Sequence, residues 1–199
     1  MDLQTRVRRI LTVPREEWPV IKAEPGDPAY IYTKYVLILA AIPAICSFIG
    51  MVLIGQSLPF VGRVRLGMAD GLRMAIFQYC GALIGVYVSA FVIAKLAPTF
   101  NSKPSVNEAL KLVAYSMTPA WIAGVFNIIP VLGILGILAS LYGLYLLYLG
   151  MPVLMETPAD KVVGYLVLSI VVIIIVWFIV ALIFGALGGA STMMGGRYY

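Results

Sequence analysis

A twenty-residue apolar run near the C-terminus constrains the fold of this chain more than any other feature. Residues 166–185, LVLSIVVIIIVWFIVALIFG, hold sixteen leucine, isoleucine, valine or phenylalanine side chains and no charge. About 20 apolar residues in a helix cross the roughly 30 Å hydrocarbon core of a bilayer. Each such side chain favours insertion by about 0.3–0.6 kcal/mol near the helix centre. The run therefore predicts a membrane-spanning helix.

The rest of the chain has the same character. Of its 199 residues 62% are hydrophobic and 12% charged, whereas a soluble domain carries about 25% charge. We therefore predict an all-α integral membrane protein, a bundle of five transmembrane helices with a short amphipathic interfacial helix at its N-terminus. The predicted spans are residues 35–55, 74–96, 110–128, 132–154 and 163–187.

The third and fourth spans are separated by a turn rather than by a charged loop. Residues 112–155 carry no charge, and as one helix they would be about 66 Å long, enough for two crossings. Asn127, Pro130 and Gly133 supply turn chemistry within residues 127–133. These two spans are expected to form a tight antiparallel hairpin.

The distribution of basic residues predicts the orientation. Ten of the 14 Lys and Arg residues would lie on one side and four on the other, and the richer side faces the cytoplasm. We predict a cytoplasmic segment over residues 1–33, a membrane domain over 34–190 and a C-terminal tail over 191–199 outside. The basic stretch 62–73 would then lie outside, and a short amphipathic segment on the outer surface is one way to accommodate it.

The N-terminal segment has the spacing of an amphipathic helix. Apolar residues recur at i, i+4, i+7 and i+8 from Leu3, and Arg6, Arg8 and Arg9 lie elsewhere on the wheel. Such a helix binds anionic lipid through its basic residues. The alternative is a frayed basic tail that only enforces topology. Trp18 and the tyrosines at 30, 32 and 35 lie where an aromatic belt would anchor the chain.

Catalytic groups are scarce in this sequence. It contains no histidine, and its acids fall in predicted loops or at span ends, so no pair of carboxylates lies at mid-membrane for acid–base work. Lys95 and Lys111 are near enough to the membrane interfaces for their ammonium groups to snorkel to water. We expect Cys46 and Cys80 to be buried thiols. We expect no enzymatic activity, no metal, no cofactor and no nucleic-acid partner.

The run AYSMTPAW (114–121) interrupts the apolar pattern of the third span. Pro119 cannot donate to the carbonyl of Tyr115, so a nearby hydroxyl should replace the lost donor. The tyrosine face of the fourth span is expected to meet this kinked segment. Either a satisfied packing cluster or a ligand or conduit site would result. The candidate polar cluster comprises Tyr115, Ser116, Thr118, Pro119, Asn127, Tyr142, Tyr145 and Tyr148.

Small residues form ridges at four-residue spacing on three of the predicted spans. Such ridges let helix backbones approach closely within a bundle or against a partner helix. The candidate packing residues are Gly81, Gly85 and Ser89 on the second span, Gly136 and Ser140 on the fourth, and Gly185 and Gly189 on the fifth.

Several motifs resemble a known family. ALKLVAYSMTPAW (109–121), LYGLYLLYLGMPVLM (141–155) and P-x-x-K-x-x-x-Y (158–165) are similar in order and spacing to the Yip family (Ypt/Rab-interacting protein domain) in its short bacterial form, and PREEWPVI (14–21) and PAICSFIGMVLIG (43–55) agree. The resemblance implies a five-helix membrane bundle in a bacterial inner membrane with a cytoplasmic N-terminus. Eukaryotic members act in ER–Golgi vesicle traffic and associate with Rab GTPases and with one another. Their longer N-terminal region and DLYGP motif are missing from this sequence.

Two functions from different classes remain open at this point. One is a non-enzymatic membrane scaffold or adaptor, whose partners are the lipid bilayer, anionic lipids, further copies of itself or other membrane proteins. The alternative is a passive channel or transporter for a lipid or small solute, lined by hydroxyls and amides.

Overall fold

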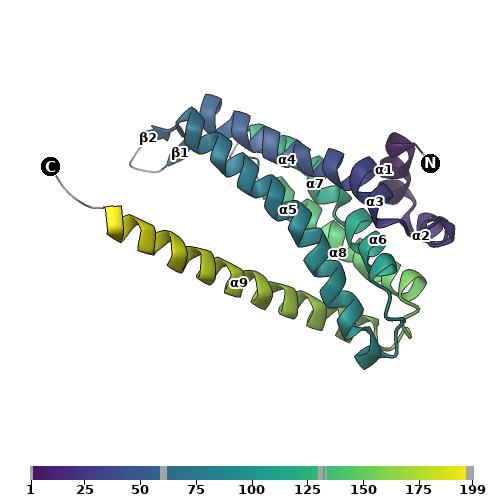
Figure 1. The fold of residues 1–199 in the computed structure, drawn as a ribbon. Helices are drawn as coiled ribbons and strands as arrows, with labels where there is room; N and C mark the ends of the chain where they lie inside the picture. Colours follow the sequence, from purple (N-terminus) through teal and green to yellow (C-terminus); the bar gives the residue numbers. More distant parts are fainter. Residues whose placement is uncertain (1, 59–61, 130–131, 133, 196–199) are drawn as a thin grey trace.

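Five helical spans make up the membrane domain (Figure 1). The computed structural model describes residues 2–58, 62–129, 132 and 134–195. Within them, the helices long and apolar enough to cross a bilayer run over Pro28–Ile54, Met68–Phe100, Val106–Ile128, Ile134–Leu154 and Val162–Ile179. The predicted fold class, an all-α five-helix membrane bundle, is confirmed.

Most spans consist of several helical segments. Two short helices, α1 (Leu3–Thr12) and α2 (Pro14–Ala23), precede the bundle. The first span comprises α3 (Pro28–Ile31), η1 (Tyr32–Val36), α4 (Leu37–Ile49) and η2 (Gly50–Ile54). The second comprises α5 (Met68–Leu96) and η3 (Ala97–Phe100). The third comprises α6 (Val106–Ser116), α7 (Thr118–Ala123) and η4 (Gly124–Ile128), the fourth is α8 (Ile134–Leu154), and the fifth belongs to α9 (Val162–Gly195).

A two-stranded hairpin joins the first two spans. Strand β1 (Gln56–Leu58) pairs antiparallel with β2 (Gly62–Val64), with Ser57 opposite Arg63. The expected surface segment over residues 62–73 does not form. Its first residues are in β2, and its last six form the first turns of α5.

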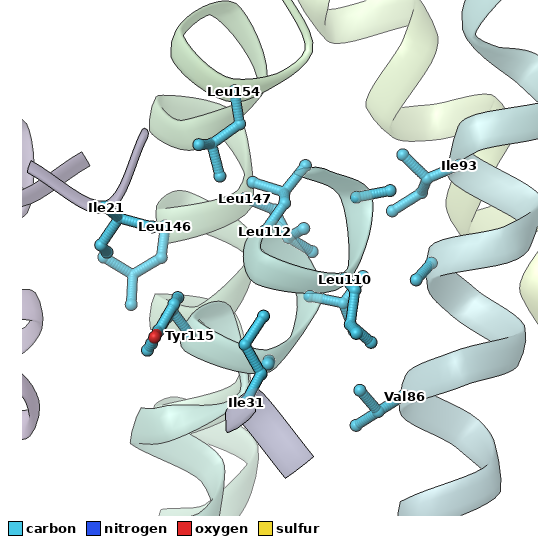
Figure 2. Close-up of a cluster of buried hydrophobic side chains, with 14 of the residues drawn as sticks. Ile21, Ile31, Val86, Ile93, Leu110, Leu112, Tyr115, Leu146, Leu147 and Leu154 are labelled. Atoms are coloured by element: carbon cyan, nitrogen blue, oxygen red, sulfur yellow. The ribbon is translucent and has the colours of Figure 1, made fainter. Parts of the chain in front are cut away.

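The third span occupies the centre of the bundle. In its most apolar window 72% of the residues are buried, against 17–33% in the other four spans. Leu110, Leu112 and Tyr115 of α6 lie among side chains from α2, α3, α5 and α8 (Figure 2). A helix therefore fills the axis of the bundle. The first, second and fourth spans pack around it, and α9 packs on α5 and α8 instead (Figure 1).

The third span breaks between Ser116 and Thr118, as the proline in AYSMTPAW predicts. Helix α6 ends at Ser116, and Pro119 lies in the first turn of α7. The Thr118 hydroxyl donates to the Tyr115 carbonyl oxygen at 2.6 Å. A neighbouring hydroxyl thus replaces the amide donor that Pro119 lacks, as expected.

The fourth span turns its glycines, and not its tyrosines, towards α6 and α7. A β-carbon built at Gly143 would lie 2.7 Å from the Ser116 carbonyl oxygen, and one at Gly150 would lie 2.5 Å from the Leu112 side chain. The expectation that the tyrosine face meets the kinked segment is wrong. A tight hairpin needs the closest backbone approach, and only the glycine face of α8 permits it.

Candidate functional site at the N-terminal end of the bundle

The N-terminal helices pack against the bundle end at which the first, third and fifth spans begin (Figure 1). Helix α1 forms where the amphipathic spacing predicts a helix, and its Ile10 is fully buried. Trp18 of α2 is also fully buried, and its indole fills the space left by Gly150. The expected membrane-belt role of Trp18 is wrong, because its ring packs between α2 and α8.

Arg6 is the centre of a buried ionic network. Its guanidinium donates to Glu17 and to Glu24, and the Arg9 guanidinium donates to the second oxygen of Glu17. The side chain of Glu17 is 0% exposed and that of Arg6 is 4% exposed. The guanidinium carbon of Arg6 also lies 5.5 Å from the centre of the Tyr115 ring, within the range of a cation–π interaction. The network ties α1 and α2 to each other and to α6.

This arrangement corrects one predicted lipid contact. Arg6 was expected to meet anionic lipid, but its charge is neutralised inside the protein by two carboxylates. Arg8 is exposed and Arg9 partly exposed. Hydrogen bonding to Glu17, reinforced by its charge, raises the pKa of Arg9 above its ordinary value.

Lys111 forms a second buried connection to the N-terminal segment. Its Nζ donates to the carbonyl oxygens of Ile21 and Glu24 at 3.2 and 2.7 Å, and to Oε1 of Glu108 at 3.1 Å. The Lys111 side chain is 3% exposed, so the expected snorkelling is wrong. The end of α2 supplies the acceptors that water would otherwise provide.

A chain of hydroxyls links the first span to the third-span break. The Tyr35 hydroxyl lies 2.6 Å from the Thr118 hydroxyl, whose single proton is used on the Tyr115 carbonyl. Tyr35 must therefore be the donor to Thr118. The rings of Tyr35 and Tyr115 meet edge to face with centroids 4.7 Å apart.

Two adjoining cavities open beside this network. The first, about 330 Å³, is lined by Glu24, Pro25, Asp27, Tyr30, Ile31, Lys111 and Tyr115. The second, about 260 Å³, shares four of these residues and adds Asp2, Leu3, Arg6, Lys34, Tyr35 and Ile38. Together they form the N-terminal cavity, our name for the space between α1, the loop after α2, the start of the first span, and α6.

The remaining members of the predicted polar cluster do not join Tyr115. The side-chain amide of Asn127 donates to Ser47 at 3.1 Å, and the Tyr142 hydroxyl donates to the Leu11 carbonyl at 2.8 Å. Tyr145 and Tyr148 are each 41% exposed. The structure thus groups Tyr115, Ser116, Thr118 and Pro119, and adds Tyr35, which was expected in the aromatic belt but is only 4% exposed.

The predicted ridges differ in their surroundings. A β-carbon at Gly85 would lie 2.9 Å from the Trp177 indole, so this part of the α5 ridge packs on α9, and Ser89 is buried. Gly81 and Gly136 have open space beside them among the described residues. Ser140 is exposed, with its hydroxyl bonded to the Gly136 carbonyl at 2.8 Å. Gly185 and Gly189 lie in the part of α9 whose packing is outside the described residues.

The loop before α9 is fastened to the same end of the molecule. Glu156 accepts a 2.9 Å hydrogen bond from Lys22 and lies 3.8 Å from Lys103. The hydrogen bond from Lys22 and the two positive charges hold the pKa of Glu156 below its ordinary value.

The Tyr165 hydroxyl donates to the Ile93 carbonyl, and its ring stacks on Phe100 at 4.9 Å. The P-x-x-K-x-x-x-Y motif therefore anchors the start of α9 to the end of α5.

Comparison with known proteins adds a family and two curated relatives. The model of the Yip1 domain matches residues 8–182. "Inner membrane protein YohC" of Escherichia coli strain K12 is 33% identical over 118 residues, 59% of this chain and 60% of that relative. The protein of the same name from E. coli O6:H1 matches with the same figures. These matches thus span about three fifths of the relatives' length. No solved structure matches the chain.

Proposed function

Because this chain belongs to the Yip1 domain family, we propose that it is a non-enzymatic scaffold of a bacterial inner membrane that assembles with itself or with other membrane proteins. The inner-membrane placement rests on the names of the two relatives. The proposed orientation has the N-terminal end of the bundle, with its ten Lys and Arg residues, in the cytoplasm.

One observation carries the scaffold proposal. The axis of the bundle is filled by the third span, which is 72% buried in its apolar window. The other four spans bury at most 33% of theirs, so they direct most of their surface sideways into the membrane. A solid centre with a large lateral surface suits assembly better than conduction.

The buried charges support the same proposal. Arg6, Glu17 and Lys111 are buried, and each is bonded to another charged group of the chain or to backbone carbonyls. Charges used in this way fix one segment on another. Charges that serve catalysis or transport must instead be available to a substrate.

The outer face of α8 is the proposed contact surface. Ile134, Ile137, Leu138 and Leu141 recur there at three- and four-residue spacing and are 57–64% exposed. Gly143 and Gly150, which pack on the third span, lie on the opposite side of the helix. A partner helix would therefore find a continuous stripe of apolar side chains along this face.

Photo-crosslinking in intact membranes tests the scaffold proposal. A photoreactive residue replacing Ile137 should capture protein, either another copy or a second membrane protein. The same residue replacing Ile174 of α9, which is 61% exposed and flanked by bulky side chains, should capture mainly lipid. Leu141→Ala, which removes bulk from the same face, should weaken the protein adduct at 137, whereas Gly81→Leu, at an open glycine on α5, should not. Equal capture of lipid alone at 137 and 174 would contradict the proposal.

Thiol labelling tests the orientation. In a cysteine-free background, cysteine at Ser105 or Asp160 should react with a membrane-impermeant reagent only from the cytoplasmic side, and cysteine at Ser57 only from outside. The opposite pattern would reverse the orientation.

A further inference from the structure

The N-terminal cavity is lined by a polar group that the bundle does not use. Tyr115 is 5% exposed and lines both parts of the cavity. The hydrogen bonds around it involve its carbonyl and leave its hydroxyl without a partner among the described residues. Figure 2 shows this hydroxyl on the side turned away from Leu110 and Leu112. This hydroxyl is not among the fully buried unpaired atoms, so it reaches the cavity and is available to a bound group.

The charged side chains that line the cavity balance, with Asp2, Glu24 and Asp27 against Arg6, Lys34 and Lys111. Arg6 is paired with Glu17 and Glu24, and Lys111 has three acceptors. Asp2, Asp27 and Lys34 make no ion pair with any described residue. The unpaired charges therefore favour a ligand that carries both a cationic and an anionic group.

The cation that fits is organic rather than a metal ion. Within the described residues no group of three or more acidic, cysteine or histidine side chains lies close enough together to hold a metal. The walls also include the rings of Tyr30 and Tyr115, and aromatic faces attract ammonium groups. A primary ammonium could donate to Glu24 or Asp27 and to the Tyr115 hydroxyl, since these line the same part of the cavity.

The cavity also offers one positive charge and an apolar exit. Lys34 is exposed and has no ion-pair partner among the described residues, so it is free to bind a phosphate. Leu3, Ile31 and Ile38 form the apolar part of the lining, and Ile38 is 48% exposed. Residues 30–34 lie in the first two turns of the first span, within about 10 Å of its end at a rise of about 1.5 Å per residue. That is the depth of lipid headgroups.

We propose that this cavity binds the headgroup of a phospholipid that carries both a primary ammonium and a phosphate. The ammonium lies beside the carboxylates of Glu24 and Asp27, with the Tyr115 hydroxyl of the same part of the cavity as a further acceptor. The phosphate is held by Lys34, and the acyl chains leave along Leu3 and Ile38 into the membrane. This inference goes beyond the scaffold function and does not depend on it.

Native mass spectrometry of the full-length protein in detergent tests the lipid site. Dioleoyl phosphatidylethanolamine should bind about tenfold more tightly than dioleoyl phosphatidylglycerol, which lacks the ammonium. It should also bind more tightly than dioleoyl phosphatidylcholine, whose methylated ammonium cannot donate hydrogen bonds. Equal binding of all three lipids would overturn the proposal.

Matched variants separate the cavity from the rest of the lipid-facing surface. Tyr115→Phe and Lys34→Gln should each weaken phosphatidylethanolamine binding about tenfold, the scale of one hydrogen bond to a charged group. Tyr148→Phe and Lys95→Gln, at exposed positions outside the cavity, should leave it unchanged. Circular dichroism checks that each variant is folded. Unchanged binding in folded Tyr115→Phe and Lys34→Gln would overturn the site.

A soluble headgroup distinguishes lipid from a free amine. Phosphoethanolamine should displace the lipid only at concentrations far above those of the lipid itself, because it lacks the acyl contacts. Thermal stabilisation by phosphoethanolamine without binding of phosphatidylethanolamine would overturn the lipid assignment in favour of a soluble ligand.

Discussion

Gly143 of α8 lies directly against the backbone of Ser116, at the break in the third span. A β-carbon at Gly143 would be 2.7 Å from the Ser116 carbonyl oxygen. A backbone atom cannot move aside as a flexible side chain can, so this contact sets how closely α8 approaches the axis of the bundle.

Gly143→Ala should therefore destabilise the protein. The added methyl group must separate the two helices, and overpacking of this kind costs about 1–3 kcal/mol. Gly81→Ala is the matched control, since a β-carbon there meets nothing within 4 Å, and alanine in a helix is usually about 0.5–1 kcal/mol better than glycine. Thermal unfolding in detergent should give opposite signs for the two variants. A change in unfolding temperature of the same sign for both variants would contradict the proposed close contact.

Thr118→Val should also destabilise the fold. It removes the donor to the Tyr115 carbonyl and the acceptor for Tyr35, and leaving a buried polar group unpaired costs about 1–3 kcal/mol. Thr118→Ser keeps the hydroxyl and should lose much less. If valine and serine at this position gave equal unfolding temperatures, the hydroxyl would not be the replacement donor.

Arg6→Met should have the largest effect on the N-terminal helices. It leaves Glu17, whose side chain is 0% exposed, in the interior with only Arg9 as its partner, and breaking a buried ion pair costs about 3–5 kcal/mol. Arg8→Met removes an exposed charge and should change stability by less than about 0.5 kcal/mol. Limited proteolysis should show that α1 and α2 are released in the first variant alone. Equal resistance of the two variants would contradict the network.

The contribution of Glu156 to stability should depend on pH. Its folded-state pKa is lowered by the hydrogen bond from Lys22, so the contribution is present above the unfolded carboxyl pKa, about 4.3. It is lost as the pH falls through the lower folded-state value. The difference in unfolding temperature between wild type and Lys22→Gln should therefore be constant near neutral pH and shrink in acid. Lys161→Gln should show no such dependence. A difference in unfolding temperature that persisted unchanged in acid would exclude the Lys22–Glu156 pair.

The sequence predicted the local chemistry of this protein better than its long-range pairing. Pro119, Tyr115 and Thr118 lie within one helical turn, so the lost amide and its replacement could be inferred from the covalent order alone. The partners of Arg6 could not be inferred in this way, because the spacing of charged residues along the chain does not show that α2 folds back to place Glu17 beside Arg6.

The rotation of the fourth span shows a second limit. The three tyrosines at 142, 145 and 148 share a face and suggested a polar interior, whereas the bundle buried Gly143 and Gly150 instead. The seven-residue spacing of these glycines was the signal that could have revealed the buried face. Tyr115 was selected from the sequence, but its place in the N-terminal cavity depends on Tyr30 and Lys34, which only the fold brings beside it.

Flux through liposomes containing the pure protein tests the central claim most directly. A bundle whose axis is filled by the third span should pass ions, small solutes and lipids no faster than protein-free liposomes, and Gly143→Ala should not change this. Flux above that background in the wild type, lost in a folded Tyr35→Phe or Thr118→Val variant, would contradict the scaffold account and identify a conduit through the bundle.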